Sequence, residues 1–260
     1  MRKFAILFGV LTFSGPAFAA DMAVKASPPV VATAFSWTGC YVGGNAGGAW
    51  GNSNVTLMET GAFLDPLSHN PPADVAFSNA LGSPGIRMSG FTGGGQVGCN
   101  YQAGSFVFGI EGDGEYTGLS GSAAATATLP IAKLAASATT SVSSHSLFTV
   151  RPRAGFAVDR TLFYVTGGYA GGNVTYSESM SQRAGVSTGG TVSSTQSGWT
   201  IGGGIEYAMT NNWTIKGEYL YVNLGSVGFA GANIVMPTFT TANSATFKEN
   251  IGRLGLNYKF

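Results

Sequence analysis

Two short motifs in this chain have the spacing of sites that carry out chemistry. Residues 93–98 match the GxGxxG pattern that binds a dinucleotide phosphate, and residues 185–189 match the GxSxG pattern that presents a nucleophilic serine. The first pattern works only between a strand and a helix, whereas its surroundings here are strand-like throughout. The second lies in a Ser/Gly-rich stretch, and no histidine follows Ser187 to act as its base. Neither motif therefore predicts a cofactor or a catalytic site.

The two histidines are no better candidates for catalysis. His69 lies beside two prolines, and His145 is followed directly by Ser146. Because adjacent residues of a regular strand point to opposite faces, His145 and Ser146 are not expected to form a base–nucleophile pair. The histidines and the two cysteines also lack the spacing of a zinc site. We expect no enzyme, metal or cofactor, and a lipid-modifying activity that uses His145 remains the alternative.

The composition narrows the class of protein. The 260 residues include 40 glycines, 12% are aromatic, only 10% are charged, and the mean hydropathy is +0.19. Soluble domains carry about 25% charged residues, and disordered chains are poor in aromatic ones. Ten prolines are too few for collagen, and a net charge of +1 argues against binding nucleic acid. These values favour a membrane protein.

The N-terminus has the features of an export signal. Arg2 and Lys3 precede a short apolar run, which ends in the small-x-small sequence Ala-Phe-Ala at residues 17–19. No later stretch has the length of a membrane-spanning helix. We predict a signal peptide over 1–19, a periplasmic linker over 20–36 and one domain over 37–260.

From residue 37 onward, apolar and polar residues alternate with the period of a β-strand. Long connections (52–88, 120–144, 178–196 and 227–244) alternate with short ones near residues 102–105, 159–161 and 210–212. An even number of strands and alternating connections are typical of bacterial outer-membrane barrels, whereas a soluble β-sandwich would have polar outer faces. We predict an all-β, eight-stranded, antiparallel up-and-down transmembrane barrel with both termini on the periplasmic side. The predicted strands are 37–50, 91–102, 106–116, 147–158, 162–176, 199–209, 213–221 and 249–260.

Charged residues collect on the polar face of these strands. An eight-stranded barrel is just wide enough for its own side chains to fill it, and buried charges must be paired. We therefore expect a salt-bridge plug in the interior, with a narrow pore for small solutes as the alternative. The expected network contains Glu111, Asp113, Glu115, Arg151, Arg153, Glu206, Lys216, Glu218, Glu249, Arg253 and Lys259.

Aromatic and cysteine residues occur at particular heights on the apolar face. Trp213, Tyr258 and Phe260 lie near the short connections, where a periplasmic aromatic girdle is expected, and Trp50, Tyr116 and Trp199 are placed in the outer girdle. Cys40 and Cys99 fall at one height on the same face of the first two strands. In an oxidising compartment this placement predicts a cross-strand disulfide.

Four segments resemble a known family. The segments are ADMAVKA at 20–26, WTGCYVGGN at 37–45, GGGQVGCNYQ at 93–102 and LGLNYKF at 254–260. They resemble the alphaproteobacterial outer-membrane immunogenic, opacity-protein-like small β-barrels of the porin family. The resemblance implies that Tyr258 and Phe260 form the signal read by the barrel-assembly machinery.

The sequence thus predicts a protein of the outer membrane with a structural role, packing the membrane and displaying its long loops. The expected partners are outer-membrane lipid, lipopolysaccharide, periplasmic chaperones and the assembly machinery, but not nucleic acid. A loop-bound ligand or a host surface remains an alternative partner.

Overall fold

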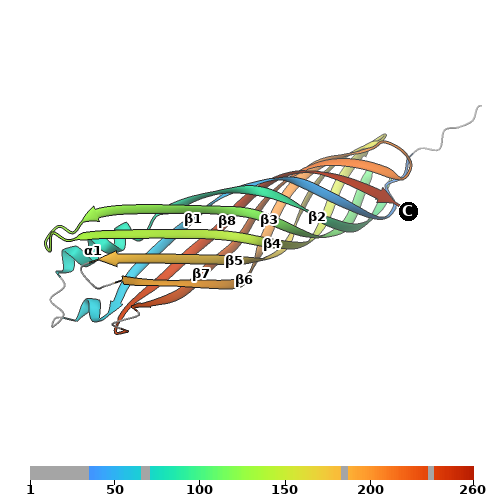
Figure 1. The fold of residues 1–260 in the computed structure, drawn as a ribbon. Coiled ribbons are helices and arrows are strands. Elements are labelled where there is room, and N and C mark those ends of the chain that lie inside the picture. Colours follow the sequence, from blue (N-terminus) through green and yellow to red (C-terminus); the bar gives the residue numbers. More distant parts are fainter. Residues whose placement is uncertain (1–34, 66–70, 183–186, 234–236) are drawn as a thin grey trace, which may run out of the picture. The chain divides into compact units, whose positions relative to one another are not determined.

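The structure is a computed structural model that describes residues 35–65, 71–182, 187–233 and 237–260. It confirms the predicted barrel: eight antiparallel strands follow one another around a closed sheet, and β1 pairs with β8 (Figure 1). The strands are β1 (Gly39–Gly61), β2 (Gly85–Ala103), β3 (Phe106–Thr128), β4 (Ala135–Val158), β5 (Thr161–Gln182), β6 (Ser187–Ala208), β7 (Trp213–Asn233) and β8 (Phe239–Lys259). The predicted signal peptide and nearly all of the predicted linker lie outside the described residues.

The strands are about twice as long as predicted, with 19 to 24 residues each. Three of the four segments expected to be long loops are mostly strand; for example, β3 and β4 pair continuously from Leu119–Ser144 to Thr128–Ala135 across the segment 120–144. The prediction was wrong here because serine, threonine, alanine and glycine replace the large apolar residues, so that the two-residue hydropathy period is weak. In the fourth, 52–88, the strands β1 and β2 extend only to Gly61 and from Gly85.

One end of the barrel carries only tight turns. Residues 104–105, 159–160 and 209–212 connect the strands there, and the C-terminus lies at the same end (Figure 1). We call this end the short-turn end and the opposite one the far end. Gly104 and Asp159 adopt positive φ values of 64° and 50°, which a two-residue hairpin turn requires.

At the far end, a short helix covers a gap in the sheet. β2 begins only at Gly85, which pairs with Asn54, so the part of β1 beyond Asn54 lacks a β2 partner. Helix α1 (Pro72–Leu81), which follows the one-turn 3-10 helix η1 (Ala62–Leu64), and the turn after it provide the missing partners. The backbone amide of Glu59 donates to Asn79 Oδ1 of the helix at 2.7 Å, and that of Leu57 donates to Ser83 Oγ of the turn at 2.9 Å. Covering an edge in this way prevents pairing with another chain. Neither helix is long and apolar enough to span a membrane, as judged over the described residues.

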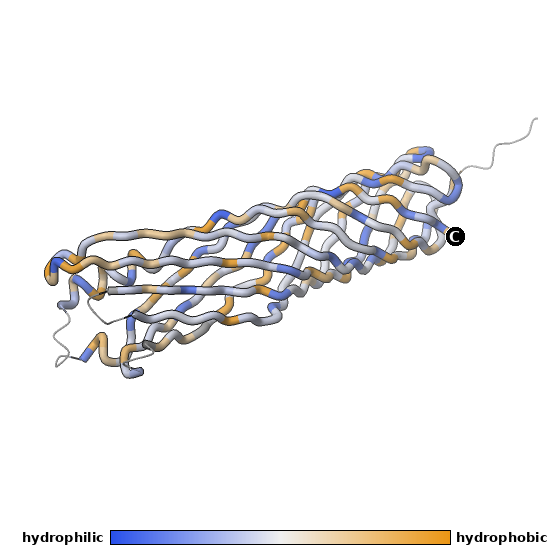
Figure 2. The backbone as a smooth tube through the Cα atoms, viewed as in Figure 1, coloured by the Kyte–Doolittle hydropathy of each residue, from blue (hydrophilic) through white to orange (hydrophobic). Residues whose placement is uncertain are grey.

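Apolar side chains point outward in a band around the half of the barrel that ends in the short turns, and hydrophobic and hydrophilic residues alternate along the strands there (Figure 2). Outward side chains such as Val97 (58% exposed) and Ile110 (54%) alternate with buried polar ones, as the sequence predicted. Trp213 and Tyr258 lie on the outer face near the short turns with ring centroids 5.2 Å apart, and Trp50, Tyr116 and Trp199 lie on it at the other edge of the band. The band is therefore the lipid-facing surface.

Beyond this band the polarity of the wall reverses. The interior contains a core of buried apolar side chains that includes Leu119, Val142 and Phe247. The exterior carries hydroxyl pairs instead, such as Thr175–Ser193 (3.1 Å) and Ser177–Thr191 (2.9 Å). The far half is therefore built like a water-soluble barrel, which differs from the uniformly polar interior that the sequence predicted.

Irregularities in the strands lie in the far half, close to the start of the apolar core. The register shifts between Ser144 and Ser146 in β4 and between Asn223 and Ser226 in β7, and the β6–β7 ladder is interrupted between Gly189 and Trp199. A bulge inserts a residue and so moves the following side chains to the other face. Leu220 occupies an inward position of β7 but is apolar, whereas the inward residues before it, Lys216 and Glu218, are charged. It is fully buried and marks the start of the apolar core.

Candidate functional site

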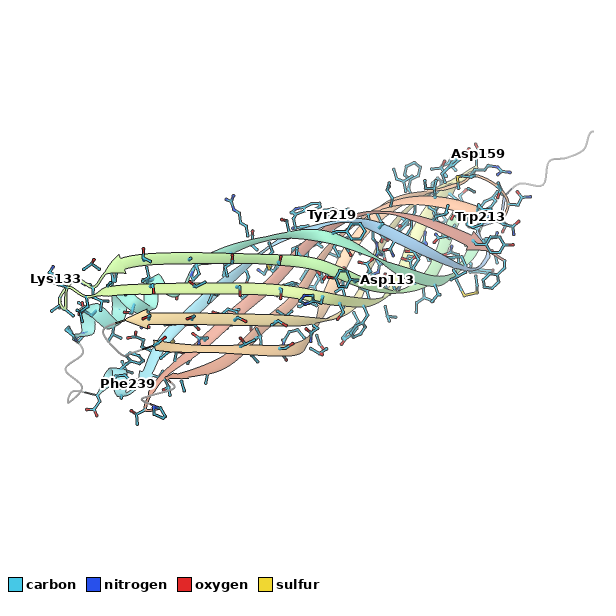
Figure 3. All side chains as sticks on the ribbon, viewed as in Figure 1. Asp113, Lys133, Asp159, Trp213, Tyr219 and Phe239 are labelled. Atoms are coloured by element: carbon cyan, nitrogen blue, oxygen red, sulfur yellow. A yellow bond between two sulfur atoms is a disulfide. The ribbon has the colours of Figure 1, made fainter. Side chains whose placement is uncertain are left out.

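The candidate site is a cluster of ionised side chains inside the lipid-facing part of the barrel (Figure 3, near Asp113). Its members come from β3, β4, β6, β7 and β8. Each is buried because it occupies one of the alternate strand positions whose side chains point into the barrel, which we call inward parity. The acids are Glu111, Asp113, Glu115, Glu206 and Glu218, and the bases are Arg151, Arg153, Lys216 and Arg253.

Glu111 is the carboxylate with the most cationic partners. Lys216 Nζ lies 2.8 and 2.9 Å from its two oxygens, and Arg151 Nη2 lies 2.8 Å from Oε1. Arg153 reaches Oε2 at 3.5 Å, and the Tyr41 hydroxyl donates to the same oxygen at 2.5 Å. Such a carboxylate remains charged because several donors replace its lost water.

A second group of contacts surrounds Arg153 toward the short-turn end. Its Nη2 lies 2.6 Å from Glu206 Oε2, and its guanidinium stacks over the Tyr164 ring at 4.0 Å. Glu206 also accepts hydrogen bonds from Thr214 at 2.5 Å and from Asn257 at 2.9 Å. Stacking of this kind suits the flat, weakly hydrated guanidinium of arginine.

A third group joins β3 to β7 and β8. Arg253 Nη2 lies 2.5 Å from Glu218 Oε2 and 3.1 Å from Asp113 Oδ2, and Nη1 contacts Glu115. Arg151 Nη2 lies 2.6 Å from the same Asp113 oxygen. Because Asp113 and Glu218 each bind two arginines, the pairs form one connected network across the lumen.

Two residues of the predicted network lie outside the cluster. Lys259 is half-buried at the short-turn mouth, where its ammonium donates to the Ser36 carbonyl and lies 4.7 Å from the Phe35 ring centre. Glu249 is fully buried between Phe247 and Ile251 in the apolar layer, and neither carboxylate oxygen has a hydrogen-bond partner among the described residues. Both predictions of pairing were wrong because parity gives the face of a residue but not its height in the barrel.

Glycines make room for the tyrosines of the cluster. A Cβ atom added at Gly98 would collide with the Tyr41 hydroxyl and ring and would lie 2.9 Å from the Ile110 carbonyl. A Cβ atom at Gly204 would lie 2.8 Å from the Tyr164 hydroxyl. These inward glycines therefore allow bulky aromatic side chains to fill a narrow lumen.

Further layers of buried side chains lie above and below the cluster. At the short-turn mouth, Trp37 (1% exposed) packs with Val107, Leu162 and Ala208, and its backbone amide donates to Gln102 Oε1 at 2.7 Å. The apolar core lies on the far side of the cluster. Leu57, Ala138 and Met180 form a last group against α1.

The motifs that resemble enzyme sites form no catalytic arrangement among the described residues. Residues 93–98 lie within β2, Gly185 and His69 lie outside the described residues, and Ser187 donates to the Met180 carbonyl at 3.3 Å. His145 and Ser146 are both exposed, since the bulge in β4 interrupts the alternation assumed for them. His145 contacts the Tyr116 ring (6.4 Å between centroids) rather than a nucleophile.

The predicted disulfide is present. Cys40 on β1 and Cys99 on β2 are register partners and form the only cystine that two cysteines allow. Both lie on the outer face near the short-turn end, so the bond joins the first two strands close to the aromatic pair Trp213–Tyr258.

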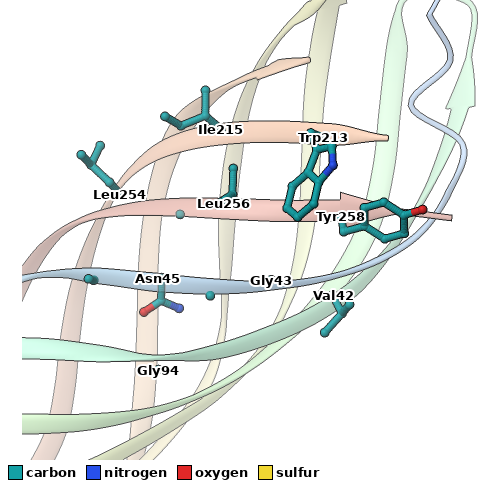
Figure 4. A pocket seen from close by; sticks show the side chains of 12 residues that line it. Val42, Gly43, Asn45, Gly94, Trp213, Ile215, Leu254, Leu256 and Tyr258 are labelled. Carbon is teal, nitrogen blue, oxygen red and sulfur yellow. The ribbon is translucent and has the colours of Figure 1, made fainter. Parts of the chain in front are cut away.

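The lipid-facing wall also has a shallow hollow of about 720 Å³ (Figure 4). Its lining includes the small residues Gly44 and Ala46 and the large apolar residues Leu254, Leu256 and Trp213. Its lining is almost entirely apolar, so it forms part of the surface that faces hydrocarbon.

Several members of the site were not identified from the sequence. Tyr41, Gln96 and Asn257 point inward and link β1, β2 and β8, with Gln96 Nε2 donating to Asn257 Oδ1 at 2.5 Å. The alternation along each strand gives their inward positions, but an uncharged side chain gives no signal for membership of an ion-pair network. Trp37 was expected in a strand, yet it folds into the mouth ahead of β1.

Comparison with known proteins agrees with the architecture. Residues 5–260 match the family model described as "Outer membrane protein beta-barrel domain". The chain is 36% identical over 253 residues to the 31 kDa outer-membrane immunogenic protein of Brucella melitensis, covering 95% of each. It is 26% identical over 256 residues to the 25 kDa outer-membrane immunogenic protein of Brucella abortus, covering 96% of this chain and 94% of the relative.

Solved structures give weaker matches. The outer membrane protein OprG of Pseudomonas aeruginosa aligns with a TM-score of 0.44 and 8% identity, covering 86% of this chain and 96% of that one. Ail of Yersinia pestis aligns with a TM-score of 0.34 and 14% identity, covering 84% and 99%. The family model, the Brucella relatives and the closed barrel together show that this chain belongs to the outer-membrane β-barrel family, within the group of outer-membrane immunogenic proteins.

Proposed function

We propose that this protein is a structural, surface-displayed component of the outer membrane whose interior is closed to solutes. The observation that carries the proposal is the stacking of buried layers along the barrel. The Trp37 group, the charge cluster, the apolar core and the Leu57 group follow one another from the short-turn end to the far end. An eight-stranded barrel has no room for a channel beside such layers.

Conductance in planar bilayers tests this proposal against the narrow-pore alternative. We expect the purified protein to leave the bilayer silent, while a large porin added to the same bilayer opens in discrete steps. Reproducible single-channel steps from the purified protein would show instead that ions pass the cluster and would favour the pore.

We also propose that the far end faces the outside of the cell. The relatives are named immunogenic, and the far end has the water-soluble construction that a segment projecting beyond the bilayer needs.

The chain has only the two paired cysteines, so an introduced cysteine would be its one free thiol. We expect a membrane-impermeant maleimide to label Ile131→Cys, in the far-end turn, on intact cells. Ser105→Cys, in a short turn, should react only after lysis. The reverse labelling pattern would show that the short-turn end faces the outside of the cell.

Tyr258 and Phe260 are proposed as the assembly signal. Both point outward at the end of the closing strand, where Phe260 is 72% exposed. Phe260→Ala should lower the amount of folded protein in the outer membrane, whereas Phe156→Ala, at a comparable outward position in β4, should lower it less. Equal effects of the two substitutions would indicate a simple loss of lipid contact.

A further inference from the structure

A polar hollow lies on the outer wall just beyond the lipid-facing band. It has a volume of about 400 Å³ and is lined in part by Asn52, Asn54, Arg87, Lys248 and Asn250. These residues come from the adjacent strands β8, β1 and β2. The hollow is therefore a built surface feature of the sheet and not the gap between two loops.

The two cations of this hollow flank one amide. Asn52 on β1 is the register partner of Arg87 on β2 and of Lys248 on β8, and all three side chains are exposed. Neighbouring strands lie about 4.8 Å apart, so the two cationic side chains leave the wall about 10 Å apart and can converge on one group between them.

No acid neutralises these cations within the described part of the chain. Neither Arg87 nor Lys248 forms an ion pair there, and the described carboxylates lie in the interior or at the two ends of the barrel. The other described cations lie in the charge cluster, at the short-turn end or, for Lys133, in the far-end turn. Arg87 and Lys248 are thus an isolated positive patch on the outer wall.

The height of the patch points to its partner. Trp50 precedes Asn52 by two residues on β1, and its ring lies 6.3 Å from that of Tyr219, whose hydroxyl donates to Asn250 at 2.6 Å. Aromatic girdles mark the level of the lipid headgroups. The patch begins directly above this girdle, where the phosphate groups of the outer-leaflet lipids are located.

We propose that this hollow, defined by Arg87, Asn52 and Lys248, binds a phosphate group of an outer-leaflet lipopolysaccharide molecule. The planar guanidinium of Arg87 suits bidentate binding of phosphate, Lys248 adds a point charge, and the Asn52 amide donates from between them. The acyl chains of the same lipid then run down the apolar wall below Trp50. The inference rests on the proposed orientation, in which the far end faces outward.

Binding of bis-phosphorylated lipid A to the full-length protein in detergent micelles tests the proposal. We expect the double variant Arg87→Gln/Lys248→Gln to bind about tenfold more weakly than the wild type, because each charge-assisted hydrogen bond contributes strongly. Lys133→Gln removes a cation at the far-end turn and should bind like the wild type. Heat-dependent gel migration of each variant verifies that the barrel is folded.

Three further arms separate the alternatives. Lipid A stripped of its phosphates should bind the wild type about tenfold more weakly, and added salt should weaken binding of the intact lipid. Equal binding by the wild type and the double variant, or equal binding of the two lipids, would overturn the proposal. Inorganic phosphate that binds as tightly as lipid A would make this a site for the free ion instead. Because micelles have no sidedness, phosphate-dependent binding combined with an inverted maleimide pattern would refute the orientation and the outer-leaflet location of the site, while the phosphate-binding hollow itself would stand.

Discussion

At the scale of single residues, Glu111 is the point at which the charges of β3, β4 and β7 meet. Lys216, Arg151 and Arg153 all share it as an ion-pair partner. Buried ion pairs gain little over an apolar core, but removing one partner leaves uncompensated charge in a medium of low polarity. The cluster therefore makes each member hard to replace singly.

Glu111→Gln should lower the free energy of unfolding by about 3–5 kcal/mol, since it keeps the shape of the side chain and removes its charge. Urea unfolding of the refolded protein in detergent, followed by tryptophan fluorescence, measures the loss. Asp159→Asn is the matched control, because it removes a carboxylate from an exposed turn in which asparagine tolerates the positive φ. Similar midpoints for both variants would mean that the cluster contributes little.

Glu178 makes the stability of the far end depend on pH. Burial in β5, nine residues beyond the outward Tyr169, raises the pKa of its carboxyl from the usual 4.5 to about 7. The folded state therefore holds a proton that the unfolded state releases, so stability falls as the pH rises from about 4.5 to about 7. Amide hydrogen exchange in the far-end halves of β4 and β5 should be slower at pH 5 than at pH 8 after correction for the intrinsic rate. Glu178→Gln should remove this difference, and an unchanged difference in that variant would assign it to another group.

At the scale of elements, each strand spans two environments. Its short-turn half has apolar residues outward and polar ones inward, whereas its far half surrounds an apolar core, with a few buried polar residues such as Glu178. In β3, for example, Glu111 and Leu119 both point inward, one into the charge cluster and the other into the apolar core. The solvent outside changes from lipid to water, and the polarity of the wall changes with it.

Leu119→Ala should reduce the free energy of unfolding by about 2–5 kcal/mol, because it opens a cavity in a filled core. Ser122→Ala, on the exposed face of the same strand, should change it by less than about 0.5 kcal/mol. Thermal unfolding of the two variants in the same detergent compares them. If both were neutral, the far half would lack the packed core that the structure shows.

At the scale of the whole molecule, closure between β1 and β8 makes the strands one cooperative unit. The ladder between them runs from Tyr41–Lys259 to Gly61–Phe239, with a break only near residues 53–54. The Cys40–Cys99 bond joins β1 to its other neighbour near the short-turn end. A closed sheet leaves few free edges, so unfolding requires opening the whole ring.

The unboiled protein should therefore migrate faster on an SDS gel than the boiled one. Cys40→Ser/Cys99→Ser should retain this shift but lose it at a lower temperature, because the bond that restricts the unfolded chain is gone, a contribution of about 2–4 kcal/mol. Thiol titration of the unreduced wild type should find no reactive cysteine. Two reactive thiols would show that the bond does not form in the membrane.

The strand order, the number of strands and the inward parity of the charges could all be predicted from the sequence. Large apolar residues such as Phe108 and Ile110 alternate with Glu111 and Asp113 and fix the two faces. The cysteine pair followed from the same parity, combined with the height of each residue. The strands of the far half could not be predicted. Its outer face contacts water, so small residues such as serine, threonine, alanine and glycine are tolerated at both outward and inward positions, and the two-residue hydropathy period is lost.

The sequence by itself therefore determined that this chain is an outer-membrane barrel with charges inside and aromatic residues at its edges, because side-chain alternation is a local property of each strand. Only the tertiary structure decided which charges meet, that Glu249 and Lys259 stand apart, that Trp37 closes the mouth, and that Arg87 and Lys248 flank Asn52. The physical reason is register: the height at which strands pair, and the bulges that shift it, depend on the closed sheet as a whole and on no single strand.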